Sequence, residues 1–414
     1  MMGTMRGSGS GSSGFGLARI VRGSVVPLFV ASCTVLGCGS RAGSEDAPED
    51  MGVEEDVGME ASADVGDVGV DADAAEDGDA GGADDADVVE DVAVEEDGEV
   101  EATIGERCFG DIFDPTAEGP DYDQFHPVIG NHCYGTDHQD IRGVRRVVFL
   151  GDSVTAGTPP TSSTQYYRSV LADILVERFR LNPPSLLWKM VNMLDGTALQ
   201  PLSGDFGCCA KWGARTDDLM RDNTQVLDCL PGSERYQTTL VIMTVGGNDI
   251  ADIRQRIADG DPIEDVWAQT RESVQLLDDT VHWLVGDPTR FPDGVYVIFA
   301  NMFEFTDGTG DIGSCTAADL GGFGVPIDDP VRAAALEEMV IWANEQYMRI
   351  AVETGTDMIM MLEHFCGHGF HNDDPTTRCY RGPGTPRWFD FTCIHPNPTG
   401  HAKIAEMFMA VVDE

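Results

Sequence analysis

Four positions in the chain carry residue types that are suited to acyl transfer. Ser153 offers a hydroxyl nucleophile, and His395 offers an imidazole near the C-terminus. A serine hydroxyl is a weak nucleophile at neutral pH and needs an adjacent base, which histidine commonly supplies. The side-chain amide of Asn248 and a backbone N–H at Gly213 are donors of the kind that stabilise an oxyanion. Each of these residues could also be an ordinary turn residue. The strands and helices predicted around it must therefore distinguish a catalytic role from a structural one.

The segments before Ser153 and Asn248 have the pattern of buried strands, so both residues follow strand ends. Short runs rich in β-branched residues alternate with longer segments of helical periodicity. This alternation predicts one α/β domain with a mostly parallel sheet, in which sites form at the carboxyl ends of the strands. The predicted strands cover residues 145–150, 239–245, 295–300 and 358–362, with a weaker candidate at 187–193. The predicted helices cover residues 165–179, 263–284, 330–354 and 398–412.

In this order the four blocks resemble the GDSL or SGNH hydrolase family, which is named for a Ser, Gly, Asn and His set. Ser153, Gly213, Asn248 and His395 match that set, and the resemblance covers roughly residues 144–413. It implies a flavodoxin-like three-layer α/β/α sandwich and the hydrolysis of esters or thioesters without a metal or other cofactor. It also implies that Ser153 is the nucleophile and His395 the base. The oxyanion hole would consist of the Ser153 and Gly213 N–H groups and the Asn248 side chain.

The sequence departs from the family pattern three residues before the histidine. The family usually has an aspartate there to orient the imidazole, whereas this chain has Thr392. Asp390 lies two residues further back, and in an extended segment residues two apart point to the same side. We therefore expect Asp390 to orient His395. Two alternatives stay open: Thr392 itself orients the imidazole, or a backbone carbonyl accepts the imidazole hydrogen and the machinery is a catalytic dyad.

The charge of the chain is large and unevenly distributed. The formal net charge is −46, and residues 41–104 hold 25 acidic residues and one arginine. Residues 105–414 carry about half of the total. The chain has no basic patch to neutralise phosphates, which argues against nucleic acid as a partner. The acidic stretch would also be repelled by an anionic membrane surface.

The N-terminal region has the pattern of an export signal. Arg19 and Arg22 precede an apolar run that is too short to span a bilayer. The run ends at Val35-Leu36-Gly37-Cys38, which resembles the lipobox of bacterial lipoproteins. We expect Cys38 to be lipid-modified, so that the enzyme is extracytoplasmic, anchored at the outer membrane or cell surface. An ordinary signal peptide cut nearby is the alternative.

The composition divides the chain into four parts. Residues 1–37 form the predicted signal peptide, and residues 38–104 an acidic, low-complexity linker that cannot bury enough apolar surface to fold. Residues 105–143 form a Cys-containing N-terminal extension, and residues 144–414 the hydrolase domain. We expect the linker to act as a spacer; weak binding of divalent cations is the alternative.

Cysteine usage agrees with an oxidising compartment. Nine cysteines lie beyond the signal region, so an odd one must be left free or paired between chains. Cys108 and Cys133 are expected to pair, and Cys208 or Cys209 is expected to pair with Cys229. No Cys-x-x-Cys pair occurs, which disfavours zinc. His364, His368 and His371 faintly resemble a metal cluster, but a loop beside the active site is the preferred interpretation.

Two hypotheses from different functional classes follow. The first is a membrane-tethered serine esterase, expected to be monomeric, that acts on a small-molecule, lipid or glycan ester such as a lysophospholipid or an acetylated glycan. Its contact with the membrane would be through the lipid anchor alone. The second is a non-catalytic surface lipoprotein that uses the same fold to bind a ligand or partner.

Overall fold

The computed structural model describes residues 102–110, 119–221, 224–303, 305–315, 317–318, 323 and 326–414. The predicted signal peptide, the lipobox cysteine Cys38 and all but the last three residues of the predicted linker lie outside the described residues.

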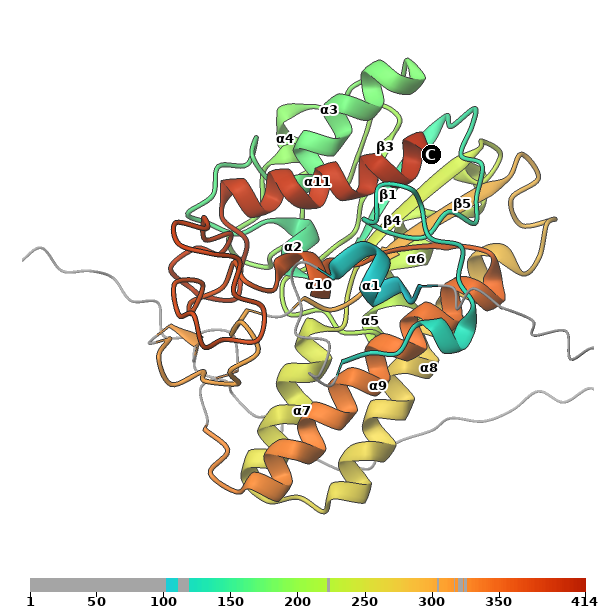
Figure 1. Ribbon diagram of the computed structural model, residues 1–414. Coiled ribbons are helices and arrows are strands. Elements are labelled where there is room, and N and C mark those ends of the chain that lie inside the picture. The colour runs from blue at the N-terminus through green and yellow to red at the C-terminus, as the bar shows by residue number, and fades with distance from the viewer. Residues whose placement is uncertain are drawn as a thin grey trace, which may run out of the picture. The chain divides into compact units, whose positions relative to one another are not determined.

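A six-stranded sheet forms the centre of the fold, in the order β2-β3-β1-β4-β5-β6 (Figure 1). All neighbouring strands pair in parallel except β2, which pairs antiparallel with β3. The strand bounds are β1 Arg146–Gly151, β2 Leu202–Ser203, β3 Phe206–Cys208, β4 Thr239–Thr244, β5 Val295–Ala300 and β6 Asp357–Ile359.

Helices cover both faces of the sheet, because the central strands are apolar on both sides. Val147 and Phe149 of β1 pack with α3 and α11, whereas Val148 and Leu150 pack with α8 and α9. This alternation gives the three-layer α/β/α arrangement that the family resemblance implies. The helix bounds are α1 Ile104–Phe109, η1 Asp123–Phe125, α2 Ser153–Ala156, α3 Tyr167–Phe179, α4 Leu186–Lys189, α5 Asp217–Met220, α6 Gln225–Cys229, η2 Gly232–Glu234, α7 Gly247–Asp259, α8 Ile263–Val285, α9 Pro330–Thr354, α10 Met361–Phe365 and α11 Pro398–Asp413.

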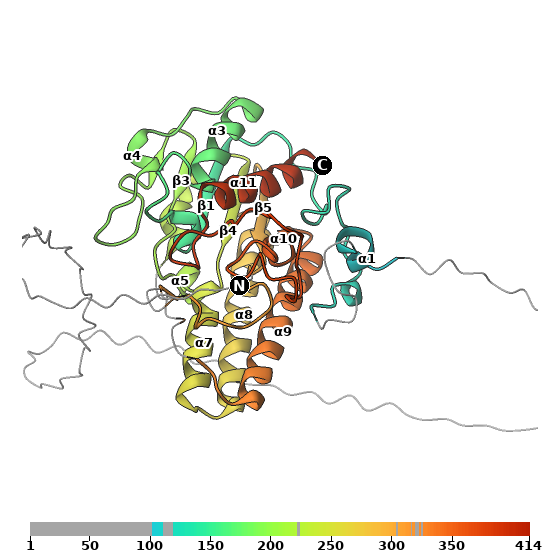
Figure 2. The same ribbon diagram turned by 60° about the vertical axis from the view of Figure 1, so that its left-hand side comes forward.

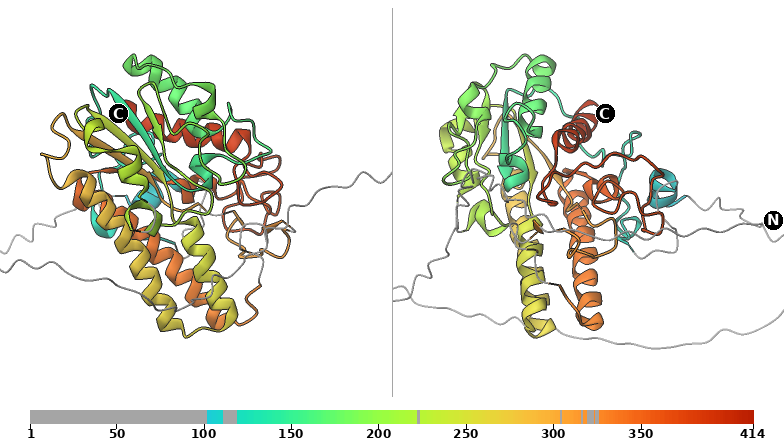
Figure 3. Two further views of the ribbon diagram at one scale, coloured as in Figure 1. Left: turned by 180° about the vertical axis from the view of Figure 1, so that it is seen from behind. Right: turned by 90° about the vertical axis from the view of Figure 1, so that its left-hand side faces the viewer.

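The long helices α7, α8 and α9 run side by side (Figure 3). Within the part of the chain that the structure describes, no helix is both long enough and apolar enough to cross a membrane.

The four main predicted strands and the four predicted helices are present, but the weaker strand candidate at residues 187–193 is wrong. Residues 186–189 form α4, whose first turn is capped by the Ser185 hydroxyl accepting from the Trp188 N–H. A short apolar run does not distinguish a strand from a helix, and here the hydrogen bond to the Ser185 cap stabilises the helix. The fourth strand also ends early, at Ile359, because α10 begins at Met361.

Within the described ranges, four disulfides connect the loops to this frame. The predicted disulfide between Cys108 and Cys133 is formed. Cys229 pairs with Cys209, one of its two predicted partners, and the other, Cys208, is free and buried. Two further bridges, Cys315–Cys393 and Cys366–Cys379, were not predicted. The N-terminal extension packs against the sheet through a bridge between Gly135 and Ile359.

Candidate active site

A sharp turn at the carboxyl end of β1 presents Ser153. Gly151 has φ +119°, and a Cβ there would lie 1.9 Å from the Thr244 carbonyl oxygen, so only glycine fits. Asp152 then caps α2 by accepting a hydrogen bond from the Val154 N–H at 2.9 Å. As a result Ser153 is the first residue of α2 and stays partly exposed.

The loop before α11 brings His395 to this serine. The Ser153 Oγ lies 2.9 Å from His395 Nε2, although 242 positions separate the two residues in the chain. With the serine hydroxyl as donor, Nε2 is the acceptor and the ring hydrogen is on Nδ1. The two predicted residues are therefore in the arrangement that a nucleophile and its base require.

Thr392 contacts the other side of the imidazole. Its Oγ1 lies 3.0 Å from His395 Nδ1 and 2.5 Å from Asp390 Oδ1. The imidazole Nδ1–H can donate to the threonine hydroxyl, which in turn donates to the carboxylate. These contacts form a continuous chain from Asp390 through Thr392 and His395 to Ser153.

The expectation that Asp390 itself orients the imidazole needs correction. Asp390 reaches His395 through the Thr392 hydroxyl, because residues 390–395 form a tight turn and not an extended segment. The Asp390 N–H donates to the His395 carbonyl, the Cys393 N–H donates to the Asp390 carbonyl, and Cys393 has φ +74°. The two-residue alternation of a strand therefore does not apply.

Burial sets the protonation of this chain of side chains. Burial lowers the pKa of His395 to about 4, so the ring is neutral at pH 7 and able to accept a proton. Burial also raises the pKa of Asp390, against the hydrogen bonds from the Thr392 hydroxyl and N–H, which lower it.

The two remaining predicted residues lie on loops that hydrogen bonds tie to the serine turn. The Lys211 N–H donates to the Gly151 carbonyl at 3.0 Å, and Asn248 Nδ2 donates to the Ala214 carbonyl at 2.9 Å. Gly213 lies between these two anchors with φ +74° and is exposed. Among the described residues, the N–H groups of Ser153 and Gly213 and the second amide hydrogen of Asn248 have no hydrogen-bond partner. These donors are available to a developing oxyanion.

Two buried aspartates support these loops, and sequence reasoning missed them. Asp249 accepts from the N–H and the hydroxyl of Thr216, which fixes the Gly213 loop to the start of α7. Asp152 accepts from the Thr244 hydroxyl beside the serine turn. Burial raises their pKa values to about 7 for Asp152 and about 6 for Asp249. The sequence feature that could have identified these two aspartates is their position directly beside Ser153 and Asn248 in the chain.

The loop that carries His395 is also covalently anchored. Cys393 pairs with Cys315 of the segment after β5. Its left-handed backbone is unusual for a residue other than glycine. The bridge lies two residues before His395 and therefore restricts the position of Thr392 and His395 together.

The other histidines of the C-terminal loops have separate partners. His364 Nε2 lies 2.8 Å from the Cys133 carbonyl, and His368 stacks on Trp388 with 3.5 Å between ring centroids. His371 Nε2 lies 3.0 Å from the Ser314 hydroxyl. No group of three potential metal ligands occurs in the described part of the chain.

A large cavity does not include these residues in its lining. It has a volume of about 1400 Å³ and is lined by α1, α7, α9 and the segment after β5, and Ser153 and His395 are not among its described lining residues. A smaller hollow of about 550 Å³ lies beside the histidine loop and is lined by Phe389, Asp390 and Phe391.

Comparison with known families adds to this geometry. The sequence profile of the GDSL-like lipase/acylhydrolase family matches residues 149–403, which is more than half of the chain and includes all four predicted positions. The chain belongs to this family. The match runs from β1 into α11 and so spans the whole sheet.

The chain also aligns with solved structures, all at low sequence identity. A candidate GDSL-like lipase from Parabacteroides merdae is 15% identical, with 66% of this chain and 99% of that chain covered and a TM-score of 0.39. A two-domain esterase active on acetylated mannans is 14% identical, with 65% and 48% covered and a TM-score of 0.33. A lipase from a goat rumen metagenome is 11% identical, with 65% and 97% covered and a TM-score of 0.37. No curated protein matches the chain.

Proposed function

We propose that this protein is an extracytoplasmic serine esterase that cleaves carboxylic esters through Ser153 and His395. The observation that carries the proposal is the 2.9 Å contact between Ser153 Oγ and His395 Nε2. Acyl esters, lysophospholipids and acetylated glycans are the substrate classes that this chemistry serves. Four disulfides in the described residues support an oxidising compartment. The lipobox pattern supports a lipid anchor at Cys38.

The reaction proceeds in two halves on these side chains. Ser153 Oγ attacks the ester carbonyl carbon while its proton moves to His395 Nε2, and the resulting oxyanion is held by the Ser153 and Gly213 N–H groups and by Asn248. Collapse expels the alcohol, which takes the proton from the imidazolium and leaves an acyl group on Ser153. A water molecule, activated by the same imidazole, then releases the acid.

A fluorophosphonate probe tests the proposal, because only an activated serine reacts with it. We expect the purified chain to be labelled at Ser153 and to hydrolyse p-nitrophenyl esters, and the chain-length profile of these esters then narrows the substrate class. A folded chain that neither labels nor hydrolyses any of these esters contradicts the proposal and favours a binding function.

Thr392→Val should lower kcat by about 10–100-fold on a soluble ester. Valine keeps the shape but removes the hydroxyl that connects His395 with Asp390, so the imidazolium loses its orientation and its link to the carboxylate. Thr392→Ser retains the hydroxyl and is the matched control, with activity close to that of the parent. Equal kcat in the valine and serine variants would exclude a role for the hydroxyl.

The pH dependence of kcat/KM should show an acid limb near pH 4 on a neutral ester. Burial lowers the pKa of His395 to about 4, and only the neutral imidazole accepts the serine proton, so activity is lost as the pH falls through that value. Thr392→Asp places a carboxylate beside the ring, which favours the imidazolium and should move the limb upward by about one pH unit or more. A parent limb near pH 6.5, or a downward shift in the aspartate variant, contradicts this account.

A further inference from the structure

Exposed apolar side chains gather on one short segment beside the candidate active site. Of the thirteen large apolar residues that are exposed in the described part of the chain, seven lie within residues 186–202, here called the apolar segment. These seven are Leu186, Leu187, Met190, Met193, Leu194, Leu199 and Leu202. Single exposed apolar residues are normal on protein surfaces, but a cluster of this kind marks an interaction site.

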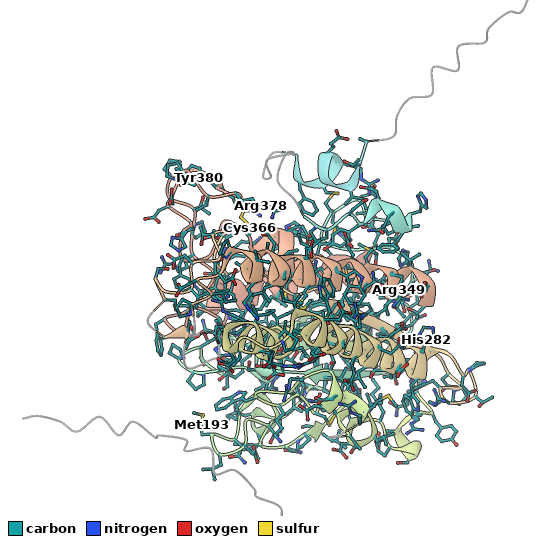
Figure 4. The ribbon with its side chains drawn as sticks, turned by 90° about the horizontal axis from the view of Figure 1, so that it is seen from below. Met193, His282, Arg349, Cys366, Arg378 and Tyr380 are labelled. Atoms are coloured by element: carbon teal, nitrogen blue, oxygen red, sulfur yellow. A yellow bond between two sulfur atoms is a disulfide. The ribbon has the colours of Figure 1, made fainter. Side chains whose placement is uncertain are left out.

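The middle of the apolar segment forms an exposed tip. Met193 is 61% exposed and Leu194 is 96% exposed, and they lie in a turn closed by the Asn192 N–H donating to the Thr197 carbonyl. Figure 4 shows Met193 at the margin of the molecule, and Figure 2 shows α4, at the start of the apolar segment, at an outer edge of the ribbon. These two apolar side chains of the turn therefore expose most of their surface to solvent.

The start of the apolar segment is fixed by a buried tryptophan and by hydrogen bonds from a buried arginine. Trp188 is fully buried, and the buried guanidinium of Arg168 donates to the Trp188 carbonyl at 2.5 Å and to the Lys189 carbonyl at 3.1 Å. The same guanidinium donates to the Ala156 carbonyl at the end of α2. Arg168 thus connects the helix of Ser153 with the apolar segment.

The tip is also connected to the candidate oxyanion hole. The Trp212 N–H donates to the Gly196 carbonyl, and a Cβ at Gly196 would lie 2.4 Å from the Trp212 side chain. The Trp212 indole N–H donates to the Gly157 carbonyl at 2.9 Å. Gly213, a predicted oxyanion donor, follows Trp212 in the chain. Trp212 therefore connects the tip with this donor.

Charge and size indicate what the apolar segment meets. It contains one lysine, Lys189, and one aspartate, Asp195, so its net charge is zero in a chain whose net charge is −46. Two side chains on a tip cannot provide the roughly 800 Å² per partner of a specific protein interface. Apolar side chains that protrude from a neutral patch can instead insert into the boundary region of a lipid layer.

We propose that the apolar segment docks the enzyme on a neutral lipid surface, with Met193 and Leu194 inserted, and so directs the candidate site toward esters presented in lipid aggregates. The inference rests on the proposed esterase function. It adds to the lipid anchor a second membrane contact, which lies beside the candidate active site and is independent of Cys38.

The test compares a tip variant with a matched surface variant in the full chain carrying Cys38→Ser, so that no lipid anchor contributes. The tip variant is Met193→Ser with Leu194→Ser, and the control is Tyr236→Ser with Val331→Ser, which are 69% and 67% exposed and lie elsewhere. Two substrates are used: water-soluble p-nitrophenyl acetate, and a long-chain p-nitrophenyl ester in phosphatidylcholine vesicles. Sedimentation with the same vesicles, in chains that also carry Ser153→Ala, measures binding without turnover.

We expect the tip variant to bind vesicles about tenfold more weakly or worse, because burying one Leu or Met side chain already contributes about that factor. Its kcat/KM on the vesicle ester should fall in parallel, whereas the soluble ester and the thermal unfolding midpoint should match those of the control. Unchanged vesicle binding overturns the inference, and so does an equal loss on both substrates. A dimer that the tip substitutions dissociate, with vesicle binding unchanged, would assign the apolar segment to a protein contact. If the parent hydrolyses neither ester, the proposed function fails, while the sedimentation result still decides on the lipid surface.

Discussion

Ser153→Ala should reduce ester hydrolysis by about 10⁴-fold or more and abolish labelling by a fluorophosphonate. The alanine removes the only atom that forms the acyl intermediate, and His395 alone cannot replace it with a positioned water of equal reactivity. His395→Ala should cause a loss of similar size, because the two residues act as a unit through their 2.9 Å contact. Initial rates on p-nitrophenyl acetate measure both variants.

The combination of these substitutions gives a sharper result than either alone. If serine and histidine share one step, the double variant is hardly slower than each single variant. Ser162→Ala changes an exposed serine of the neighbouring loop and is the control, with parent activity expected. A Ser153→Ala chain that keeps more than a tenth of the parent rate would exclude the covalent mechanism.

The sequence was sufficient for β1 and β4 because these central strands are buried on both faces. Residues 146–151 and 239–244 are short, β-branched and bounded by turn residues, and their burial is complete from end to end. The helix at residues 330–354 was likewise predicted, and the observed bounds of α9 agree with the prediction. The position of Ser153 and Asn248 after strand ends then followed from the general topology of parallel sheets.

The parts that the sequence did not predict depend on contacts between distant residues. β3 has only three residues, and it is a strand because it pairs with Val147, Val148 and Phe149 of β1. α7 begins directly at the Gly-Asn-Asp turn, and its amphipathic pattern was not recognised beside that motif. Such features depend on tertiary neighbours more than on local preference.

The surroundings of His395 also depend on a contact with a residue that is distant in the sequence. The sequence indicated that Thr392 departs from the family pattern and that an acid was near. It did not indicate that the backbone turns at Cys393, because the left-handed conformation there accompanies a disulfide to a residue 78 positions away. With that turn, the hydroxyl of Thr392 lies between the acid and the imidazole, so the residue that seemed to break the pattern completes it through one more hydrogen bond.

Asn248→Ala should lower kcat by about 10²–10³-fold with a smaller change in KM. The loss of one oxyanion donor costs this much in acyl transfer, because the donor acts on charge that is present mainly in the transition state. In this protein one hydrogen of the Asn248 amide already binds the Ala214 carbonyl at 2.9 Å, which fixes the other hydrogen in direction. Steady-state kinetics on a short soluble ester measure the effect on kcat and KM separately.

A second variant separates the role in the oxyanion hole from the role in holding the Gly213 loop. Asn248→Asp keeps the size of the side chain but cannot donate from its carboxylate, and its charge repels the oxyanion, so its kcat should fall at least as far as that of the alanine variant. The free energy of unfolding should change by only about 1 kcal/mol in the alanine variant, the usual contribution of one hydrogen bond. If both variants keep kcat within fivefold while their stability falls, Asn248 supports the loop only, and the oxyanion must be held by the N–H groups of Ser153 and Gly213 alone.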